Sequence, residues 1–393
     1  MFTIGVTGTD GKTSCSHFIA QALDTHDRRC GVIGTLGYGL YGELSTSMHT
    51  TPDALTVQQA LRSMQTAGAR CVVSEVSSHA MDQGRVRGVS FDLAVLTNLT
   101  RDHLDYHGDL ESYAEAKRKL FHSDGLRYDV INADDNFGSA LLYAIPPGGA
   151  PIAYRLENNQ FRTRFPAQWV IGRNLQFDVN GLSMDVQTPW GSGSMHSGLL
   201  GRFNASNLLA TLASLCVVGL PFQEALRRLA VTRTVAGRME RFDMGEGRPL
   251  AVIDFAHTAA ALEAVLSSLR AHCRGKLWCV FGAGGDRDRG KRSLMGAVAE
   301  RHADEIVLTD DNPRTEDAQR IIDDICSGLK QPATVHIEHD RAHAIGWAMR
   351  HAGAQDIVLI AGKGHESVQI VGNRALPFSD RERVRAIARE WSR

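Results

Sequence analysis

The opening stretch MFTIGVTGTDGKTS most constrains the fold, because it sets a glycine-rich loop between an apolar run and a helical pattern. The run Phe2–Val6 predicts a strand, and the pattern from Lys12 to about Leu23 predicts a helix. In the loop Gly8–Ser14, glycines let the backbone approach anionic oxygens, Lys12 adds positive charge, and the Thr13 hydroxyl can ligate Mg²⁺. The loop has the short Gly-x-x-Gly-Lys-Thr form, and its place between strand and helix predicts that it binds nucleotide phosphates. The predicted contacts are Gly8, Thr9, Gly11, Lys12, Thr13 and Ser14.

Strand and helix patterns alternate through most of the chain. Short apolar runs at Cys71–Val76 and Phe91–Leu96, with a helical pattern at Ala54–Ala67 before the first, predict a parallel sheet covered by helices. The region from about Ala150 to Ser197 is rich in Gly, Gln, Asn and β-formers and predicts antiparallel strands and turns. The alternation restarts after Gly237. The sequence therefore predicts an α/β protein of two domains, residues 1–236 and 237–393.

Charge and composition narrow the partners. The chain has 43 Lys and Arg against 44 Asp and Glu, so no net field favours nucleic acid or an anionic membrane. No apolar run approaches the ~20 residues that cross a bilayer. The seven cysteines include no Cys-x-x-Cys pair, which argues against zinc and disulfides and favours a reducing cytoplasm. We therefore expect a cytoplasmic protein with neither nucleic acid nor a membrane as partner.

Seven further stretches complete a recognisable order. They are EVSSHAMDQGRV, TNLTRDHLDYHGDLESYAEAKRKLF, GRFNASNLLA, GRMERF, FGAGGDRDRGKR, DDNPRTE and AGKGHE. With the phosphate loop, they closely resemble the Mur ligase family over essentially the whole chain, and within it the UDP-N-acetylmuramoyl-tripeptide synthetases (the MurE group). The resemblance implies a central ATP-binding domain with a phosphate loop and a mostly parallel sheet. It also implies a C-terminal, Rossmann-like α/β domain that binds the amino acid.

The resemblance implies an ATP-dependent amide ligase. ATP would phosphorylate a carboxylate, and an amino acid's amine would attack the acyl phosphate, giving an amide, ADP and phosphate. Two Mg²⁺ ions are expected, because both reacting groups are anions whose repulsion must be neutralised. Thr13 and Glu75 resemble ligands of the first ion, and His103 of the second. Lys117 matches the family lysine that becomes carbamylated to hold that second ion, and Lys12, Glu75, His103 and Lys117 are the implied catalytic residues.

Further nucleotide contacts are implied by the same resemblance. Asn204 and Asn207 resemble residues on the adenine side, whereas Arg238 and Asp254 resemble residues that reach ATP from the second domain. Asp10 stands where the family loop usually carries Asn, so it should weaken ATP binding modestly unless it points away. Ala259 and Ala260 replace the usual Pro-Asp pair, so a local contact is expected to be missing.

The amino-acid and acyl pockets are also implied by resemblance. Six residues match the family's contacts to meso-diaminopimelate: Arg287, Asp311, Asn312, Arg314, Gly362 and Glu366. Arginine grips carboxylates in a fork and aspartate accepts from ammonium groups, which suits a diamino diacid. Four residues resemble contacts to the muramoyl-dipeptide end: Thr50, Thr51, Ser77 and Arg85. Small-molecule carboxylates and amino acids are thus the expected partners, and the sequence leaves monomer and homodimer open.

The acyl substrate has several candidates. Typical relatives carry a UDP-gripping domain before the phosphate loop, and this chain is expected to lack it. The protein would then act on a smaller carboxylate in a specialised pathway, take a UDP-free muropeptide in recycling, or borrow a domain from a partner. A UDP-independent ligase, specialised or recycling, is the favoured reading. The alternatives are a true UDP-MurNAc-dipeptide ligase and a ligase like folylpolyglutamate synthetase. An inactive binding subunit and a generic NTPase fit worse, because the catalytic and amino-acid motifs are present.

Overall fold

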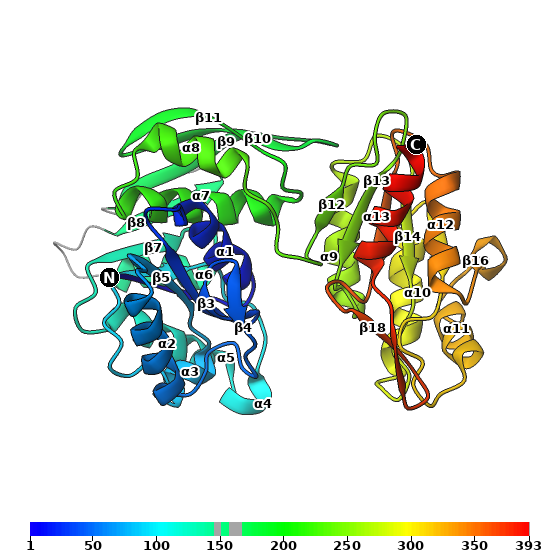
Figure 1. The fold of residues 1–393 in the computed structure, drawn as a ribbon, viewed down its shortest axis with the longest axis horizontal. Coiled ribbons are helices and arrows are strands. Elements are labelled where there is room, and N and C mark those ends of the chain that lie inside the picture. Colours follow the sequence, from blue (N-terminus) through cyan, green and yellow to red (C-terminus); the bar gives the residue numbers. More distant parts are fainter. Residues whose placement is uncertain (145–150, 157–166, 393) are drawn as a thin grey trace. The chain divides into compact units, whose positions relative to one another are not determined.

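The computed structural model describes residues 1–144, 151–156 and 167–392, and these form two compact units (Figure 1). The first unit comprises Met1–Gln176, Leu182–Gly198 and Arg202–Thr232, and the second comprises Phe177–Gly181, Leu199–Gly201 and Arg233–Arg393. The passage into the second unit at Arg233 lies close to the predicted boundary at Gly237. Ala150 and residues 157–166 of the predicted β-rich region lie outside the described residues.

The first unit is built on a sheet whose strand order is β11-β10-β9-β8-β7-β6-β1-β5-β2-β3-β4. The strands are β1 (Phe2–Thr7), β2 (Cys30–Gly34), β3 (Gly37–Leu40), β4 (Glu43–Ser45), β5 (Cys71–Glu75), β6 (Leu93–Leu96), β7 (Tyr128–Asn132), β8 (Ile152–Leu156), β9 (Gln168–Asp178), β10 (Gly181–Thr188) and β11 (Gly191–Ser197). β1 pairs in parallel with both β5 and β6, so Ile4 lies between Val73 and Leu93. Because parallel strands share one carboxyl edge, the segments that follow these three strands meet there.

Helices cover this sheet. They are α1 (Lys12–Leu23), α2 (Ala54–Thr66), α3 (Ser78–Asp82), α4 (Leu104–His107), α5 (Leu110–Arg118), α6 (Asn136–Ala144), α7 (Arg202–Val217) and α8 (Phe222–Ala230), with a 3₁₀ turn at Lys119–His122. α1 packs against α7, whose side chains are nearly all buried. α7 is therefore an interior helix over most of its length, although it carries the buried polar residues Asn204, Asn207, Thr211 and Ser214.

The expectation of antiparallel strands between about Ala150 and Ser197 is confirmed in one part and wrong in another. β10 and β11 pair antiparallel, with Met184 opposite Met195. β8 instead continues the parallel sheet beside β7 and β9, with Ile152 opposite Gln168 in β9. Pairing direction depends on partners distant in sequence, so local β-propensity could not reveal it.

Asp129 in β7 gives this unit a pH-dependent stability. Its Oδ1 is buried without a hydrogen-bond partner among the described residues, and burial raises its pKa from 3.8 to about 6. Between these values the folded state keeps a proton that the unfolded state has lost, so the free energy of unfolding falls as pH rises through this window. Asp129→Asn is therefore expected to stabilise the protein by about 3 kcal/mol at pH 8 and hardly at all near pH 3.5. Urea unfolding at both pH values, with the exposed Asp124→Asn as control, checks this, and an equal gain at both would contradict it.

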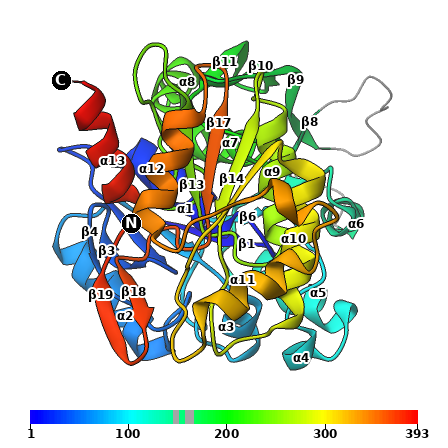
Figure 2. The same ribbon diagram turned by 90° about the vertical axis from the view of Figure 1, so that its right-hand side faces the viewer.

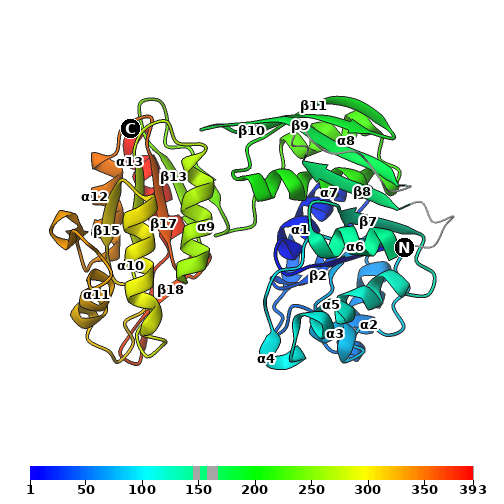
Figure 3. The ribbon, with the colours of Figure 1, turned by 180° about the vertical axis from the view of Figure 1, so that it is seen from behind.

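The second unit is a six-stranded sheet with helices on both faces (Figures 2 and 3). Its order is β12-β13-β17-β14-β15-β16, and only β12 runs antiparallel to its neighbour. The strands are β12 (Glu240–Phe242), β13 (Leu250–Asp254), β14 (Leu277–Phe281), β15 (Glu305–Leu308), β16 (His336–Ile337) and β17 (Ile357–Ala361), with a separate hairpin of β18 (Val368–Val371) and β19 (Arg374–Pro377). The helices are α9 (Ala259–Arg270), α10 (Gly290–His302), α11 (Ala318–Cys326), α12 (Arg341–His351) and α13 (Asp380–Trp391), with a 3₁₀ turn at Pro332–Thr334.

Alternate strand residues of this unit supply two apolar cores. Leu359 and its neighbours pack with α9, α10 and α11, whereas Val358 and Ile360 pack with α12 and α13. This doubly covered parallel sheet is the predicted Rossmann-like arrangement. Among the described residues of either unit, no helix combines the length and apolarity that a membrane crossing requires.

Candidate active site

The phosphate loop follows β1 and leads into α1, as the opening stretch predicts. Gly11 has φ +82°, and a Cβ there would lie 2.8 Å from Asn207 Oδ1, so glycine is needed for both conformation and space. Lys12 Nζ donates hydrogen bonds to the carbonyl oxygens of Gly8 and Thr9, both at 2.8 Å. Burial lowers the pKa of Lys12, while Glu75 opposes this effect. The lysine is thus held over the loop, where it can meet phosphate oxygens.

Glu75 ends β5 beside the first turn of α1, which contains Thr13 and Ser14. Its buried carboxylate accepts hydrogen bonds from Thr13 Oγ1 at 2.8 Å and from Thr35 N and Oγ1 at 2.9 and 3.2 Å. Burial raises the pKa of Glu75, and the bonds from Thr13 and Thr35 counteract the rise. A carboxylate beside two hydroxyls is an oxygen-rich donor set of the kind that Mg²⁺ prefers, so the residues fit the ion. The sequence reasoning missed Thr35, which lies in no recognised motif.

Glu75→Gln is expected to weaken Mg²⁺–ATP binding by roughly tenfold or more, because the neutral amide removes the charged ligand from this donor set. Binding of ATP without Mg²⁺ should change much less. Calorimetric titration with and without the ion measures both affinities. Glu43→Gln, at a carboxylate that is 69% exposed and pairs with Arg29, is the control. Equal losses with and without Mg²⁺ would contradict the role of Glu75.

Lys117 projects from α5 into the interior and is 1% exposed. Its Nζ donates to Gly8 O at 2.8 Å and lies 4.4 Å from the centroid of the Tyr113 ring. Burial, helped by the charge of Lys12, lowers the pKa of Lys117 to about 6. The amine is therefore mostly neutral at pH 7, which is the form that reacts with CO₂ to give a carbamate.

His103 lies at the start of α4 with φ +52° and a side chain that is 46% exposed. Its Nε2 is 3.4 Å from Asp102 Oδ2, and its ring centroid is 4.9 Å from that of His79. The same ring is 6.1 Å from Tyr113, the neighbour of Lys117, so His103 and Lys117 flank a shared side chain. Among the described residues no three His, Cys, Asp or Glu side chains gather as a metal site.

A cavity of about 580 Å³ opens beside Gly11. Asn207 lines it, whereas Asn204 lies behind and accepts a hydrogen bond from Asn207 Nδ2 at 3.2 Å. Asp10 also lines it, with its Oδ2 accepting from Thr100 Oγ1 at 3.4 Å. The lining residues that the sequence reasoning did not single out are Thr97, Asn98, Asp134, Arg155, Leu156, Arg202, Phe203 and Ser206. Five of these residues lie in motifs that the sequence analysis identified, so they could have been selected from the sequence. Thr97 and Asn98 lie in TNLTRDH, and Arg202, Phe203 and Ser206 lie in GRFNASN.

The four residues expected on the acyl side lie close together. Thr51 Oγ1 donates to the last carbonyl of β5 at 2.7 Å and accepts from Ser77 N at 3.1 Å. Arg85 Nη1 donates to Thr51 O at 2.9 Å, and Thr50 Oγ1 accepts from Thr35 Oγ1 at 3.1 Å. This cluster therefore adjoins the carboxylate expected to hold the metal.

In the second unit, Asp254 ends β13 and is buried. It accepts hydrogen bonds from Met239 N and Ala256 N, both at 2.8 Å. Burial raises the pKa of Asp254, and these amide bonds counteract the rise. The Arg238 guanidinium lies 5.0 Å from the centroid of the Phe255 ring. Asp254 thus holds the turn that carries Arg238.

Two loops of the second unit join through a buried lysine. Lys363 Nζ donates to Asn312 Oδ1 and to Glu366 Oε2, both at 2.9 Å, and Asn312 Nδ2 donates to Glu366 Oε2 at 3.0 Å. Although burial favours the neutral acid, these bonds hold the pKa of Glu366 below its usual value. The sequence reasoning assigned Asn312 and Glu366 but missed Lys363, which lies between the two glycines of AGKGHE.

The other residues predicted to bind the amino-acid substrate lie in the loops that follow the carboxyl ends of β14, β15 and β17. Arg314 has φ +53° and donates from Nη1 to Gly285 O at 2.8 Å. A Cβ on Gly284 would lie 2.9 Å from Arg314 Nη1 and 3.6 Å from Arg287 Cγ, so both arginines border this glycine. Gly362 has φ +116°, and a Cβ there would lie 2.7 Å from Asp311 Oδ2. These contacts form two groups of predicted residues: Arg287 with Arg314, and Asp311 with Gly362.

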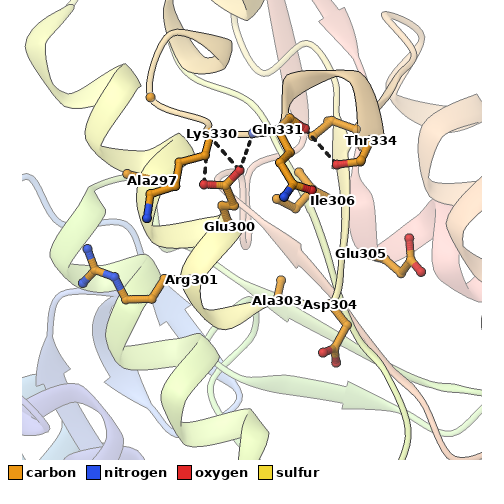
Figure 4. A pocket seen from close by; sticks show the side chains of 12 residues that line it. Ala297, Glu300, Arg301, Ala303, Asp304, Glu305, Ile306, Lys330, Gln331 and Thr334 are labelled. Atoms are coloured by element: carbon orange, nitrogen blue, oxygen red, sulfur yellow. Dashed lines mark hydrogen bonds between the residues drawn. The ribbon is translucent and has the colours of Figure 1, made fainter.

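A separate cavity of about 650 Å³ lies among α10, β15 and residues 328–335 (Figure 4). The Glu300 carboxylate at its wall accepts from Lys330 N at 2.8 and 3.0 Å and from Gln331 N at 2.8 Å. None of the site residues predicted from the sequence lines it. Its polar groups stabilise a turn.

Comparison with known families decides the classification. The Mur ligase middle domain matches residues 6–215, and the Mur ligase glutamate ligase domain matches residues 237–364. The chain belongs to the Mur ligase family. Membership makes it an ATP-dependent ligase that forms C–N bonds, and Mur ligases generally use ATP with Mg²⁺.

Individual Mur ligases resemble the whole chain. Two relatives bear the name UDP-N-acetylmuramoyl-L-alanyl-D-glutamate–2,6-diaminopimelate ligase. The protein from Coxiella burnetii is 51% identical over 98% of this chain and 78% of its own length. The protein from Alkalilimnicola ehrlichii is 51% identical over 98% of this chain and 76% of its own length. A solved structure of an enzyme of that name is 38% identical, with a TM-score of 0.81 over all of this chain and 79% of the other.

Proposed function

We propose that the protein joins meso-diaminopimelate, or a closely similar diamino diacid, to the D-glutamyl carboxylate of a UDP-MurNAc dipeptide. Relatives that are named for this reaction and are 51% identical over 98% of the chain carry the proposal. They favour the UDP-linked alternative over the UDP-independent reading preferred from the sequence.

In the first unit, the phosphate loop and Lys12 would hold the phosphates, and Thr13 with Glu75 would hold the first ion. Bound ATP supplies the phosphoryl group, and Mg²⁺ supplies charge that offsets its repulsion from the carboxylate. Lys117, once carbamylated, would present an anionic oxygen next to His103 for a second ion. Thr51, Ser77 and Arg85 would place the acyl carboxylate beside that centre.

In the second unit, arginines and acids would orient the incoming amino acid. Arg314 suits the carboxylate of diaminopimelate, and Asp311 and Glu366 suit its ammonium group. The reacting amine, after its ammonium form has released a proton to solvent, would attack the acyl carbon of the acyl phosphate. The amide C–N bond would form as phosphate leaves with the electron pair of the broken C–O bond, and the surplus proton on nitrogen would pass to water or to the leaving phosphate. Arg238 and Asp254 are proposed to complete the nucleotide contacts.

Phosphate release tests this function directly. The protein would be given Mg²⁺–ATP with UDP-MurNAc-L-Ala-D-Glu, UDP-free L-Ala-D-Glu or small diacids, each with a panel of amino acids. We expect turnover only when a carboxylate and an amine are both present, and fastest with the UDP-linked dipeptide and meso-diaminopimelate. Turnover with only a UDP-free carboxylate would contradict the proposal that the acyl substrate is a UDP-MurNAc dipeptide. Phosphate release at the same rate without either substrate would contradict the expected coupling of ATP cleavage to amide formation.

A further inference from the structure

Arg341 and Asp380 form a fully buried ion pair in the second unit. Arg341 is the first residue of α12 and Asp380 is the first residue of α13, and both side chains are 0% exposed. The guanidinium bonds both carboxylate oxygens, from Nε at 2.7 Å and from Nη2 at 2.8 Å. Burial opposes the charged guanidinium, yet Asp380, with weaker help from Asp311 and Glu366, keeps the pKa of Arg341 above its usual value.

The pair is tied to the loops that carry the amino-acid residues. Arg341 Nη2 also donates to Ala361 O at 2.9 Å, and Nη1 lies 3.5 Å from Asp310 O. Ala361 immediately precedes Gly362, and Asp310 immediately precedes Asp311. One guanidinium therefore holds the chain where each of the two loops begins.

These loops have little room to move. A Cβ on Gly362 would lie 2.7 Å from Asp311 Oδ2, so the backbone of one loop already touches the carboxylate of the other. Asn312 Oδ1 accepts from Lys363 Nζ and from Ile370 N, both at 2.9 Å. A small shift at Ala361 would carry through these contacts to the residues proposed to bind the amino acid.

We propose that the Arg341–Asp380 pair is a positioning device for amino-acid recognition, which fixes the spacing of the Asp311 and Gly362 loops without touching the substrate. This inference rests on the proposed function for the identity of the pocket. Net stabilisation is a poor reason for such a pair, because replacing a buried ion pair with apolar residues of similar volume is often neutral or stabilising. Removing one partner alone would leave a buried charge and destabilise the fold, so the pair must be changed together.

The test is the double variant Arg341→Met/Asp380→Leu, assayed with the amino acid that the wild-type protein uses best. We expect the KM for that amino acid to rise roughly tenfold or more, with the KM for Mg²⁺–ATP and the thermal midpoint nearly unchanged. Hydrogen exchange of the amides in residues 361–366 should accelerate, and this readout needs no turnover. The control is Arg270→Met/Asp304→Asn, where the arginine also bonds an acid and the carbonyl of Gly275, at 2.6 Å each, but at the opposite end of β14.

An unchanged amino-acid KM with unchanged exchange would overturn the positioning role, as would equal rises in the KM for ATP and the amino acid. If the double variant does not fold, Arg341→Lys decides, because one ammonium cannot reproduce the fork that reaches Asp380 and Ala361 together. That variant must raise the amino-acid KM selectively, and an unchanged value rejects the role. A wild-type protein that prefers another amino acid would overturn the proposed substrate and leave this test in force.

Discussion

Lys117→Ala is expected to lower the kcat of ligation by roughly a thousandfold or more, while Mg²⁺–ATP still binds. The reason is the environment of the amine, which is buried, bonded to Gly8 O and largely neutral at pH 7. A neutral amine can form the carbamate that would supply the missing anionic ligand for a second ion. Phosphate release measures kcat, and calorimetry measures ATP binding.

Lys119→Ala is the matched control, because Lys119 lies one residue beyond α5 with its side chain 47% exposed and an ion pair to Asp82 at 3.3 Å. It should keep near-normal activity. Wild-type protein freed of CO₂ should regain activity with bicarbonate at pH 8 but not at pH 5, since below about 6 the Lys117 amine is protonated and unreactive. Full activity of Lys117→Ala would reject the carbamate role.

Arg314→Ala is expected to raise the KM for diaminopimelate by roughly 10- to 100-fold, with less than about a twofold change for ATP. The loss corresponds to a charge-assisted contact between the guanidinium and a substrate carboxylate. Steady-state kinetics with each substrate varied in turn gives both constants. We expect this selectivity because Arg314 lies in the second unit, where it bonds Gly285 O and borders Gly284 among the residues proposed to bind the amino acid.

Arg320→Ala, at an exposed arginine of α11, is the control and should leave both constants unchanged. Arg314→Lys should give a KM for diaminopimelate between those of the wild type and Arg314→Ala. An ammonium keeps the positive charge but cannot bond both carboxylate oxygens as a guanidinium does. If Arg314→Ala raised both KM values equally, Arg314 would not select the amino acid.

Short sequence patterns predicted the elements whose structure depends on neighbouring residues. Strand β1 and helix α1 were predictable because apolar periodicity and the glycine loop determine them within a short stretch. The parallel pairing of β8 with β7 and β9 was not, because direction is decided between segments far apart in the chain.

The same division applies to the site. Residues inside recognisable motifs, such as Glu75 and Asn312, could be selected from the sequence. Thr35 lies outside every motif and emerged only once folding placed its hydroxyl on Glu75. Lys363 lies inside AGKGHE, yet its role became clear only from the contact of its ammonium with Glu366. The sequence around Arg341 does not distinguish it from other helical arginines, because its partner Asp380 lies 39 residues later in the chain.

Arg314 occupies the left-handed backbone region, where φ +53° costs a residue with a side chain about 1 kcal/mol and costs glycine little. Hydrogen bonds from Arg314 N to Ile370 O and from Gly372 N to Arg314 O hold it there. Selection for heat resistance alone would drive position 314 towards glycine, and under the proposed role of Arg314 in amino-acid binding, selection for ligation would drive it back to arginine. Thermostability screens of this protein should therefore score product formation alongside survival of the fold.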